Sequence, residues 1–216
     1  MFSTTQLIHT SLPEKYSCTC SVYKRVRDEI GVLIKVVKGL SSYEFGGSFL
    51  KNFTNISNTI SSTTNIKMLK RDDIYTDAAF LGYELSQTMT DKHLKEVCTD
   101  FSSAYENIAK EKRKMNGLLK DVLEELTILK KTCKQIDHQR KVIKNTRIEL
   151  EKKLQSNIYK EDEKVELENR LDTLCTKVTK EMEDFMALNI VQGIVIKIGN
   201  IHKDFCLKSG EYLSKF

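Results

Sequence analysis

The sequence predicts an all-α fold in which three long, kinked helices pack antiparallel as a coiled-coil bundle. Its 216 residues include nine glycines, one proline and no tryptophan, a composition typical of long helices joined by few turns. From Leu94 to Leu154 the chain has no proline and a single glycine. Apolar residues recur there in alternating steps of four and three, the heptad pattern that holds one helix against another.

As one straight helix, this stretch is roughly 90 Å long at about 1.5 Å per residue. A globular protein of this length does not need such a helix, so the helix itself is the first indication of function. Three positions of its heptad seam are cationic: Lys112, Arg140 and Arg147.

The first helix is predicted to begin at Glu14, because apolar residues from Val22 to Leu40 recur in steps of three and four. The pattern resumes from Phe49 to Ile60. We therefore expect one long first helix with a kink or break near Gly46 and Gly47.

Two shorter segments precede the long helix. A polar run at 61–65 is predicted to be a loop, and the spacing of apolar residues predicts a helix over 72–85. Residues 89–92 either form a turn or join the long helix directly, and the sequence does not decide between these alternatives.

The last third of the chain is predicted to be one helix that starts near Glu161, where clustered carboxylates complement a helix N-terminus. The long helix before it ends within 155–159. The β-branched run 190–198 has some strand character, but helical spacing continues through it, so we interpret it as helix. Such dense apolar content indicates burial on several sides, at the centre of a bundle or in a dimer interface.

We expect one domain over 15–216, preceded by an N-terminal segment, 1–14, that is disordered or a weak amphipathic helix. Residues 1–12 lack the charged and continuously apolar regions of a signal peptide. The most apolar run, 186–201, is interrupted by polar residues and is interpreted as too short to span a bilayer. These features predict a cytoplasmic protein.

Charge is segregated along the chain, although the net charge is only +5. Residues 130–147 carry seven cationic side chains against one anionic side chain, Asp137, whereas residues 161–172 are mainly acidic. Two interpretations of the basic stretch are open: solvated charge on a coiled coil, or a surface for anionic lipid or nucleic acid. The segregation favours a polar contact surface over a uniformly basic nucleic-acid binder.

No catalytic pattern is present, so we expect no enzyme, no cofactor and no metal site. The histidines His9, His93, His138 and His202 are scattered, and no metalloprotease, phosphate-loop, nucleophile-elbow or dinucleotide motif occurs. Cys18 and Cys20 form a lone C-x-C pair without a second pair, which argues against zinc.

Three local features resemble the BAR domain family, and in particular its short fungal amphiphysin-like members. They are Phe101–Ala109 followed by Leu118–Leu123, the basic run Lys134–Lys141, and the apolar close Ile194–Leu213. The resemblance covers about residues 15–216. It implies an antiparallel dimer that forms an elongated crescent and senses or shapes curved membranes, peripheral to the membrane, in endocytosis or membrane trafficking near the actin cytoskeleton. The N-terminal segment lacks the basic residues of the family's inserting helix.

By this resemblance, two sets of residues are candidate sites, and the partners are anionic phospholipid membrane and a second copy or a related BAR protein. The candidates for membrane binding are cationic: Lys130, Lys134, Arg140, Lys141, Lys144, Arg147, Lys152, Lys153, Lys160 and Lys164. The candidates for the dimer interface are apolar: Val191, Ile194, Val195, Ile198, Ile201 and Phe205.

The alternative interpretation is a coiled-coil scaffold or tethering protein without direct lipid binding. It explains the heptad seam but not the concentration of cations toward one end of the long helix. A nucleic-acid binder is a third interpretation with weaker support, since few aromatic residues lie in the basic stretch and no recognition motif is present.

Overall fold

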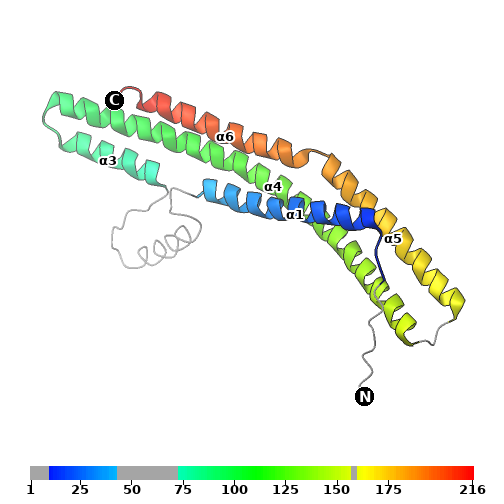
Figure 1. Cartoon of the computed structure of the whole chain (residues 1–216). Coiled ribbons are helices and arrows are strands. Elements are labelled where there is room, and N and C mark those ends of the chain that lie inside the picture. Colours follow the sequence, from blue (N-terminus) through cyan, green and yellow to red (C-terminus); the bar gives the residue numbers. More distant parts are fainter. Residues whose placement is uncertain (1–9, 43–72, 157–159) are drawn as a thin grey trace, which may run out of the picture. The chain divides into compact units, whose positions relative to one another are not determined.

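The computed structural model describes residues 10–42, 73–156 and 160–216. The expectations for residues 1–9, for the kink near Gly46 and Gly47 and for the loop at 61–65 lie outside these ranges. Helices make up 91% of the described residues, and no strand occurs among them. The all-α prediction is therefore confirmed (Figure 1).

The described helices are α1 (Glu14–Leu40), α3 (Ile74–Thr88), α4 (Lys92–Ser156), α5 (Glu161–Ala187) and α6 (Ile190–Leu213). They form two compact units. Unit 1 comprises Met1–Val32 with Leu126–Val191, and unit 2 comprises Leu33–Glu125 with Gln192–Phe216. Helices α1 and α4 each continue from one unit into the other. The division neither confirms nor contradicts the single domain expected over 15–216, which stays a prediction.

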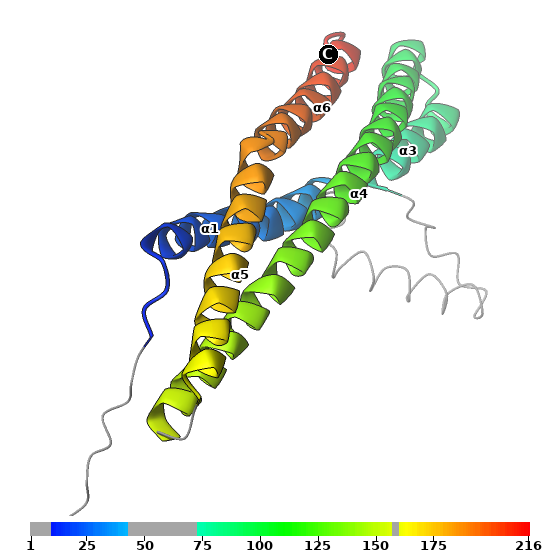
Figure 2. The ribbon, with the colours of Figure 1, turned by 90° about the vertical axis from the view of Figure 1, so that its right-hand side faces the viewer.

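Helix α4 runs unbroken for 65 residues, as the heptad pattern predicts (Figure 2). The middle of its seam is fully buried, with Leu119, Val122 and Leu126 at 0% exposure. Burial continues to Leu150, whereas Leu94 at the start of the seam is half exposed. Apolar burial along the seam, rather than helix propensity, therefore stabilises most of this long helix.

The chain turns between α3 and α4, which decides the alternative that the sequence left open. Met89 donates the last helical hydrogen bond of α3 to the Leu85 carbonyl at 3.1 Å, and its own extended backbone (φ −75°, ψ 127°) ends the helix. The Asp91 carboxylate then accepts from the Leu94 amide at 2.9 Å, the hydrogen bond of a helix N-cap. A cap of this kind starts a new helix instead of extending the old one.

A break separates α5 from α6, where the sequence was interpreted as one continuous helix. Helix α5 ends at Ala187, and Asn189 adopts a left-handed conformation with φ of 46°. Asparagine tolerates this conformation better than most residues. Apolar periodicity continues on both sides of Asn189, so the pattern alone gives no sign of the break. The β-branched run after it is helical, as expected.

In unit 1, α1 packs against both α4 and α5. The Tyr23 side chain is fully buried, and its hydroxyl donates to the Cys133 carbonyl of α4 at 2.9 Å. Its ring meets Phe185 of α5 edge-on, with centroids 6.0 Å apart, a favourable aromatic geometry. Lys153 of α4 pairs with Glu163 of α5 at 2.9 Å across the connection between the two helices.

In unit 2, α6 runs antiparallel to α4. Lys197 pairs with Glu125, and Lys208 pairs with Glu111 at 3.2 Å, so residue numbers rise along one helix as they fall along the other. Helix α3 approaches α4 closely at Gly82. A Cβ atom at this position would lie 2.8 Å from the Phe101 ring, so only glycine allows this contact.

The cationic seam position Lys112 is explained by the end of α1. Its side chain is 1% exposed, and Nζ donates to the Leu40 carbonyl at 2.8 Å. The same ammonium lies 5.9 Å from the Phe205 ring centroid. A cation at the C-terminus of a helix complements the helix dipole, so Lys112 joins α1, α4 and α6 inside unit 2.

Candidate interaction surfaces

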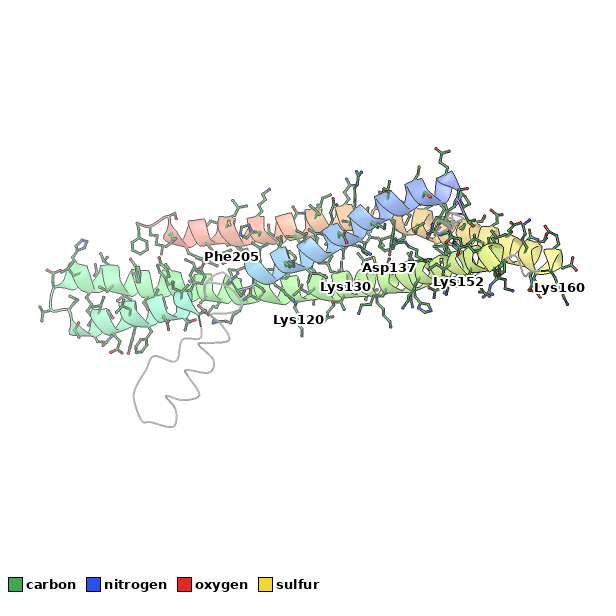
Figure 3. All side chains as sticks on the ribbon, turned by 60° about the horizontal axis from the view of Figure 1, so that its bottom comes forward. Lys120, Lys130, Asp137, Lys152, Lys160 and Phe205 are labelled. Atoms are coloured by element: carbon green, nitrogen blue, oxygen red, sulfur yellow. The ribbon has the colours of Figure 1, made fainter. Side chains whose placement is uncertain are left out.

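Arg140, a predicted membrane-binding residue, lies inside unit 1. Its guanidinium forms an ion pair with Asp137, donates to Cys20 Sγ at 3.1 Å and lies 5.5 Å from the Tyr23 ring centroid. Asp137 also accepts from Arg27 of α1 at 3.1 Å, and Figure 3 shows it between α1 and α4. The structure thus assigns Arg140 to a part-buried polar network that fixes α1 against α4.

Three more of the predicted membrane-binding residues are held by carboxylates of unit 1. Arg147 lies 3.4 Å from Glu151, and Lys153 and Lys164 pair with acidic residues at the start of α5. The remaining six candidates are exposed (Figure 3 labels Lys130, Lys152 and Lys160). None of these six forms an ion pair with a residue in the described ranges. They are Lys130, Lys134, Lys141, Lys144, Lys152 and Lys160.

The exposed lysines of α4 form one surface of unit 1. We define the lysine surface as Lys130, Lys131, Lys134, Lys141 and Lys144, all exposed. Lys131 was not among the predicted candidates because it lies outside the stripe that the sequence suggested. Ile128, three residues before Lys131 and 66% exposed, adds an apolar group at one end. Residues three apart on a helix are neighbours on its surface.

Helix α5 carries an oppositely charged surface in the same unit. We define the carboxylate surface as Asp162, Glu168 and Asp172, which are exposed and surround the half-exposed Val165. None of the three carboxylates forms a salt bridge within the described part of the chain. Sequence reasoning interpreted the carboxylates at 161–163 as a helix start, and it expected a polar contact surface from the charge segregation without naming these three carboxylates as one.

A groove of about 590 Å³ borders the carboxylate surface. Glu168 and Asp172 line it together with residues 10–14 of the N-terminal segment, and Leu150 and Leu171 supply apolar walls. The Thr10 hydroxyl oxygen is buried there and has no hydrogen-bond partner in the described ranges. The groove therefore offers oxygen acceptors above an apolar surface.

A second groove, of about 830 Å³, lies between α4 and α5. Lys131 and Lys134 line one side, Glu181 and Asp184 line the other, and Phe185 contributes apolar surface. Both grooves belong to unit 1, and both combine apolar walls with charge.

The predicted dimer-interface residues are divided between the core and the surface. Ile194, Ile198, Ile201 and Phe205 are at most 8% exposed and pack within their own chain. Val195 is 49% exposed. Only the outward part of the predicted set is therefore accessible to another molecule, and the dimer interface stays a prediction.

The helical stretch that contains α5 and α6 includes an apolar window as long as a membrane span. Within Glu161–Leu213, an 18-residue window has a mean hydropathy of 1.3, and 22% of it is buried. By length and composition alone, this helical stretch meets the criteria for crossing a membrane, whereas the sequence interpretation judged 186–201 too short and too polar. These criteria are also met by core helices of soluble proteins, so they do not assign the stretch to a membrane.

Buried thiols and phenols of unit 1 have altered acidity. Burial raises the pKa of Tyr16 to about 12 and the pKa of Cys175 to about 11. Burial also raises the pKa of Tyr23 and of Cys133. All six cysteines are free thiols. In the described ranges, no three His, Cys, Asp or Glu side chains gather in a group that could hold a metal ion.

Three known proteins that are similar to this chain share one name. No protein-family model matches the chain. It is 51% identical over 211 residues to Spore wall protein 12 of Enterocytozoon bieneusi, covering 98% of this chain and 92% of the relative. It is also 30% identical to Spore wall protein 12 of Encephalitozoon cuniculi (96% and 90% covered) and 28% identical to Spore wall protein 12 of Nosema bombycis (96% and 91% covered).

These relatives contradict the resemblance to the BAR domain family, which was wrong. The same relatives contradict four further predictions, which were also wrong. These are the membrane-curvature function, its links to endocytosis, membrane trafficking and actin, the lipid and BAR partners, and the cytoplasmic location. The physical reason is that the motifs were degenerate. Any long coiled-coil helix with an apolar seam and solvated lysines reproduces their spacing.

Proposed function

Because the chain belongs to the spore wall protein 12 family, we propose that it is a structural, non-catalytic component of a spore wall. One observation carries this proposal: 51% identity to a protein named Spore wall protein 12, across 98% of the chain. The proposal keeps the scaffold alternative of the sequence interpretation, and the name of the relative supports a wall as its location.

The fold supports a scaffold role. Within each unit, the buried apolar seam of α4 is close-packed against neighbouring helices, α1 and α5 in unit 1 and α3 and α6 in unit 2. We infer that the helices pack as an antiparallel coiled-coil bundle and that the chain associates with other molecules through its exposed faces. Well-packed units with several contact surfaces are what a structural layer requires.

The proposal that the protein is not an enzyme rests on the chemistry of the exposed groups. The two grooves of unit 1 are lined by lysines, carboxylates, amides and apolar side chains, together with the hydroxyls of Thr10, Ser11 and Thr132 and the imidazole of His138. Thr132 donates to the Ile128 carbonyl at 3.3 Å, and none of these hydroxyls forms a hydrogen bond with His138 or a carboxylate in the described ranges. Acyl or phosphoryl transfer would need a nucleophile paired with a general base in that way. Charged and apolar groups of this kind are typical of protein interfaces.

Immunogold labelling of sectioned spores with an antibody against the chain tests the proposal. We expect gold particles over the wall, and we expect the protein to remain with isolated walls after detergent extraction of membranes. Serum depleted with the purified protein is the control for background. Label confined to the cell interior, with full release by mild detergent, would refute the wall assignment.

A further inference from the structure

We propose that unit 1 binds a second copy of this chain, with the lysine surface of one copy docked on the carboxylate surface and its groove in the other. The inference rests on the proposed function, because it supplies a means by which a wall component joins its neighbours. Both halves of the contact are present in every copy.

The two surfaces carry opposite charge. Between residues 130 and 152 the chain has eight cationic and three anionic side chains, and between residues 160 and 172 it has three cationic and six anionic side chains. Arg140 and Arg147 are already paired with Asp137 and Glu151 of the same helix, so the exposed excess on α4 is lysine. Complementary surfaces of this kind steer association and fix its register.

The groove beside the carboxylate surface fits a lysine side chain. An aliphatic stem would lie against Leu150 and Leu171, and the ammonium would reach the carboxylates of Glu14, Glu168 and Asp172. The partnerless hydroxyl oxygen of Thr10 supplies a further acceptor. Long cationic side chains commonly bury their stems in this way while their charged ends remain near polar groups.

Each surface also carries one exposed aliphatic residue, Ile128 beside the lysine surface at 66% exposure and Val165 within the carboxylate surface at 46%. Burial of such groups contributes affinity that exposed ion pairs alone rarely provide. The contact therefore combines charge complementarity with one exposed aliphatic residue from each helix.

The contact joins unlike surfaces. Two lysine surfaces repel one another, so the lysine surface of each copy needs the carboxylate surface of another. Two copies can meet this need reciprocally in a closed two-fold dimer, or each copy can contact two different neighbours head to tail. Head-to-tail contacts that do not close into rings produce open-ended assemblies. An extended layer requires association of this open-ended kind.

The test uses purified full-length chain in sedimentation velocity at increasing protein concentration. Wild type is expected to associate at about 50 mM salt and to weaken by at least about tenfold at about 500 mM, where screening shortens the reach of exposed charges. Two variants reverse the surfaces separately: Lys141→Glu with Lys144→Glu, and Glu168→Lys with Asp172→Lys. Each alone is expected to lose association by about tenfold or more.

An equimolar mixture of the two variants is expected to regain association, because the unchanged lysine surface of one meets the unchanged carboxylate surface of the other. Lys24→Glu with Lys35→Glu on α1 makes the same charge change outside both surfaces and should associate like wild type. Circular dichroism confirms that every variant is folded.

Wild type that stays monomeric at low salt, association that neither salt nor the variants alter, or a mixture that fails to regain association would each overturn the inference. These outcomes concern the contact alone. The wall location is tested by labelling of spores, so either proposal can fail while the other stands.

Discussion

Tyr23 offers a quantitative test of how unit 1 is held together. Its ring is fully buried between α4 and α5, and its hydroxyl donates to the Cys133 carbonyl at 2.9 Å. Tyr23→Phe removes one neutral hydrogen bond, while Cys133 keeps its helical hydrogen bond within α4, so we expect a loss of about 1 kcal/mol in the free energy of unfolding. Tyr23→Ala removes the ring and leaves a cavity, which costs about 4 kcal/mol.

Amide hydrogen exchange is the appropriate assay, because two compact units need not unfold together and a single denaturation curve then has no defined free energy. Protection of α5 amides should fall by roughly fivefold in Tyr23→Phe and by roughly a thousandfold in Tyr23→Ala, since about 1.4 kcal/mol corresponds to a factor of ten. Tyr83→Ala, at a side chain 54% exposed, should change protection little.

Two results would refute this reasoning. Equal losses in Tyr23→Phe and Tyr23→Ala would show that the hydroxyl, and not ring burial, dominates. A loss spread evenly over the amides of both units would show that Tyr23 does not act locally in unit 1.

Three further predictions concern the cores of both units. Lys112→Met should destabilise unit 2 by about 1–3 kcal/mol, measured by hydrogen exchange of unit 2 amides, because the Leu40 carbonyl loses its charged donor; unchanged protection would contradict this. Gly82→Ala should cost about 1–3 kcal/mol from overpacking, whereas Gly117→Ala, with nothing within 4 Å of the new Cβ, should stabilise by about 0.5–1 kcal/mol. The buried thiols and phenols of unit 1 have folded pKa values above their unfolded values of 9.0 and 10.0, so their contribution is complete below pH 9 and is lost as pH rises toward about 12. Titration of stability with pH should show this fall, and Cys175→Ser, which removes one titrating thiol, should make it shallower.

Sequence periodicity was sufficient to predict the long helix, because burial along a heptad seam depends on spacing along the chain. The seam from Ile108 to Leu150 is buried as the heptads predict, and α4 ends at Ser156, within the expected boundary. Each seam residue needs only a neighbouring helix, of any identity, to become buried. Helix content and the extent of the long helix therefore follow from local spacing.

The function of individual cations could not be predicted in the same way. Lys112 and Arg140 occupy seam positions, and each meets a group distant in sequence: the Leu40 carbonyl for Lys112, and Cys20 for Arg140, whose ion pair with Asp137 is local. A basic run looks the same whether its members face solvent or a neighbouring helix. The spacing therefore could not separate the exposed Lys141 from the part-buried Arg140.

By itself, the sequence determined the helical class, the helix over 94–154 and the separation of basic from acidic segments, because these depend on residue type and spacing along one chain. Only the tertiary structure decided that Asn189 interrupts the last helix, that part of the predicted interface is internal core, and that Glu168 and Asp172 border a groove with Leu150. The core and the groove arise where residues far apart in sequence are brought into contact, and the break at Asn189 is a backbone conformation that the continuing apolar periodicity does not record.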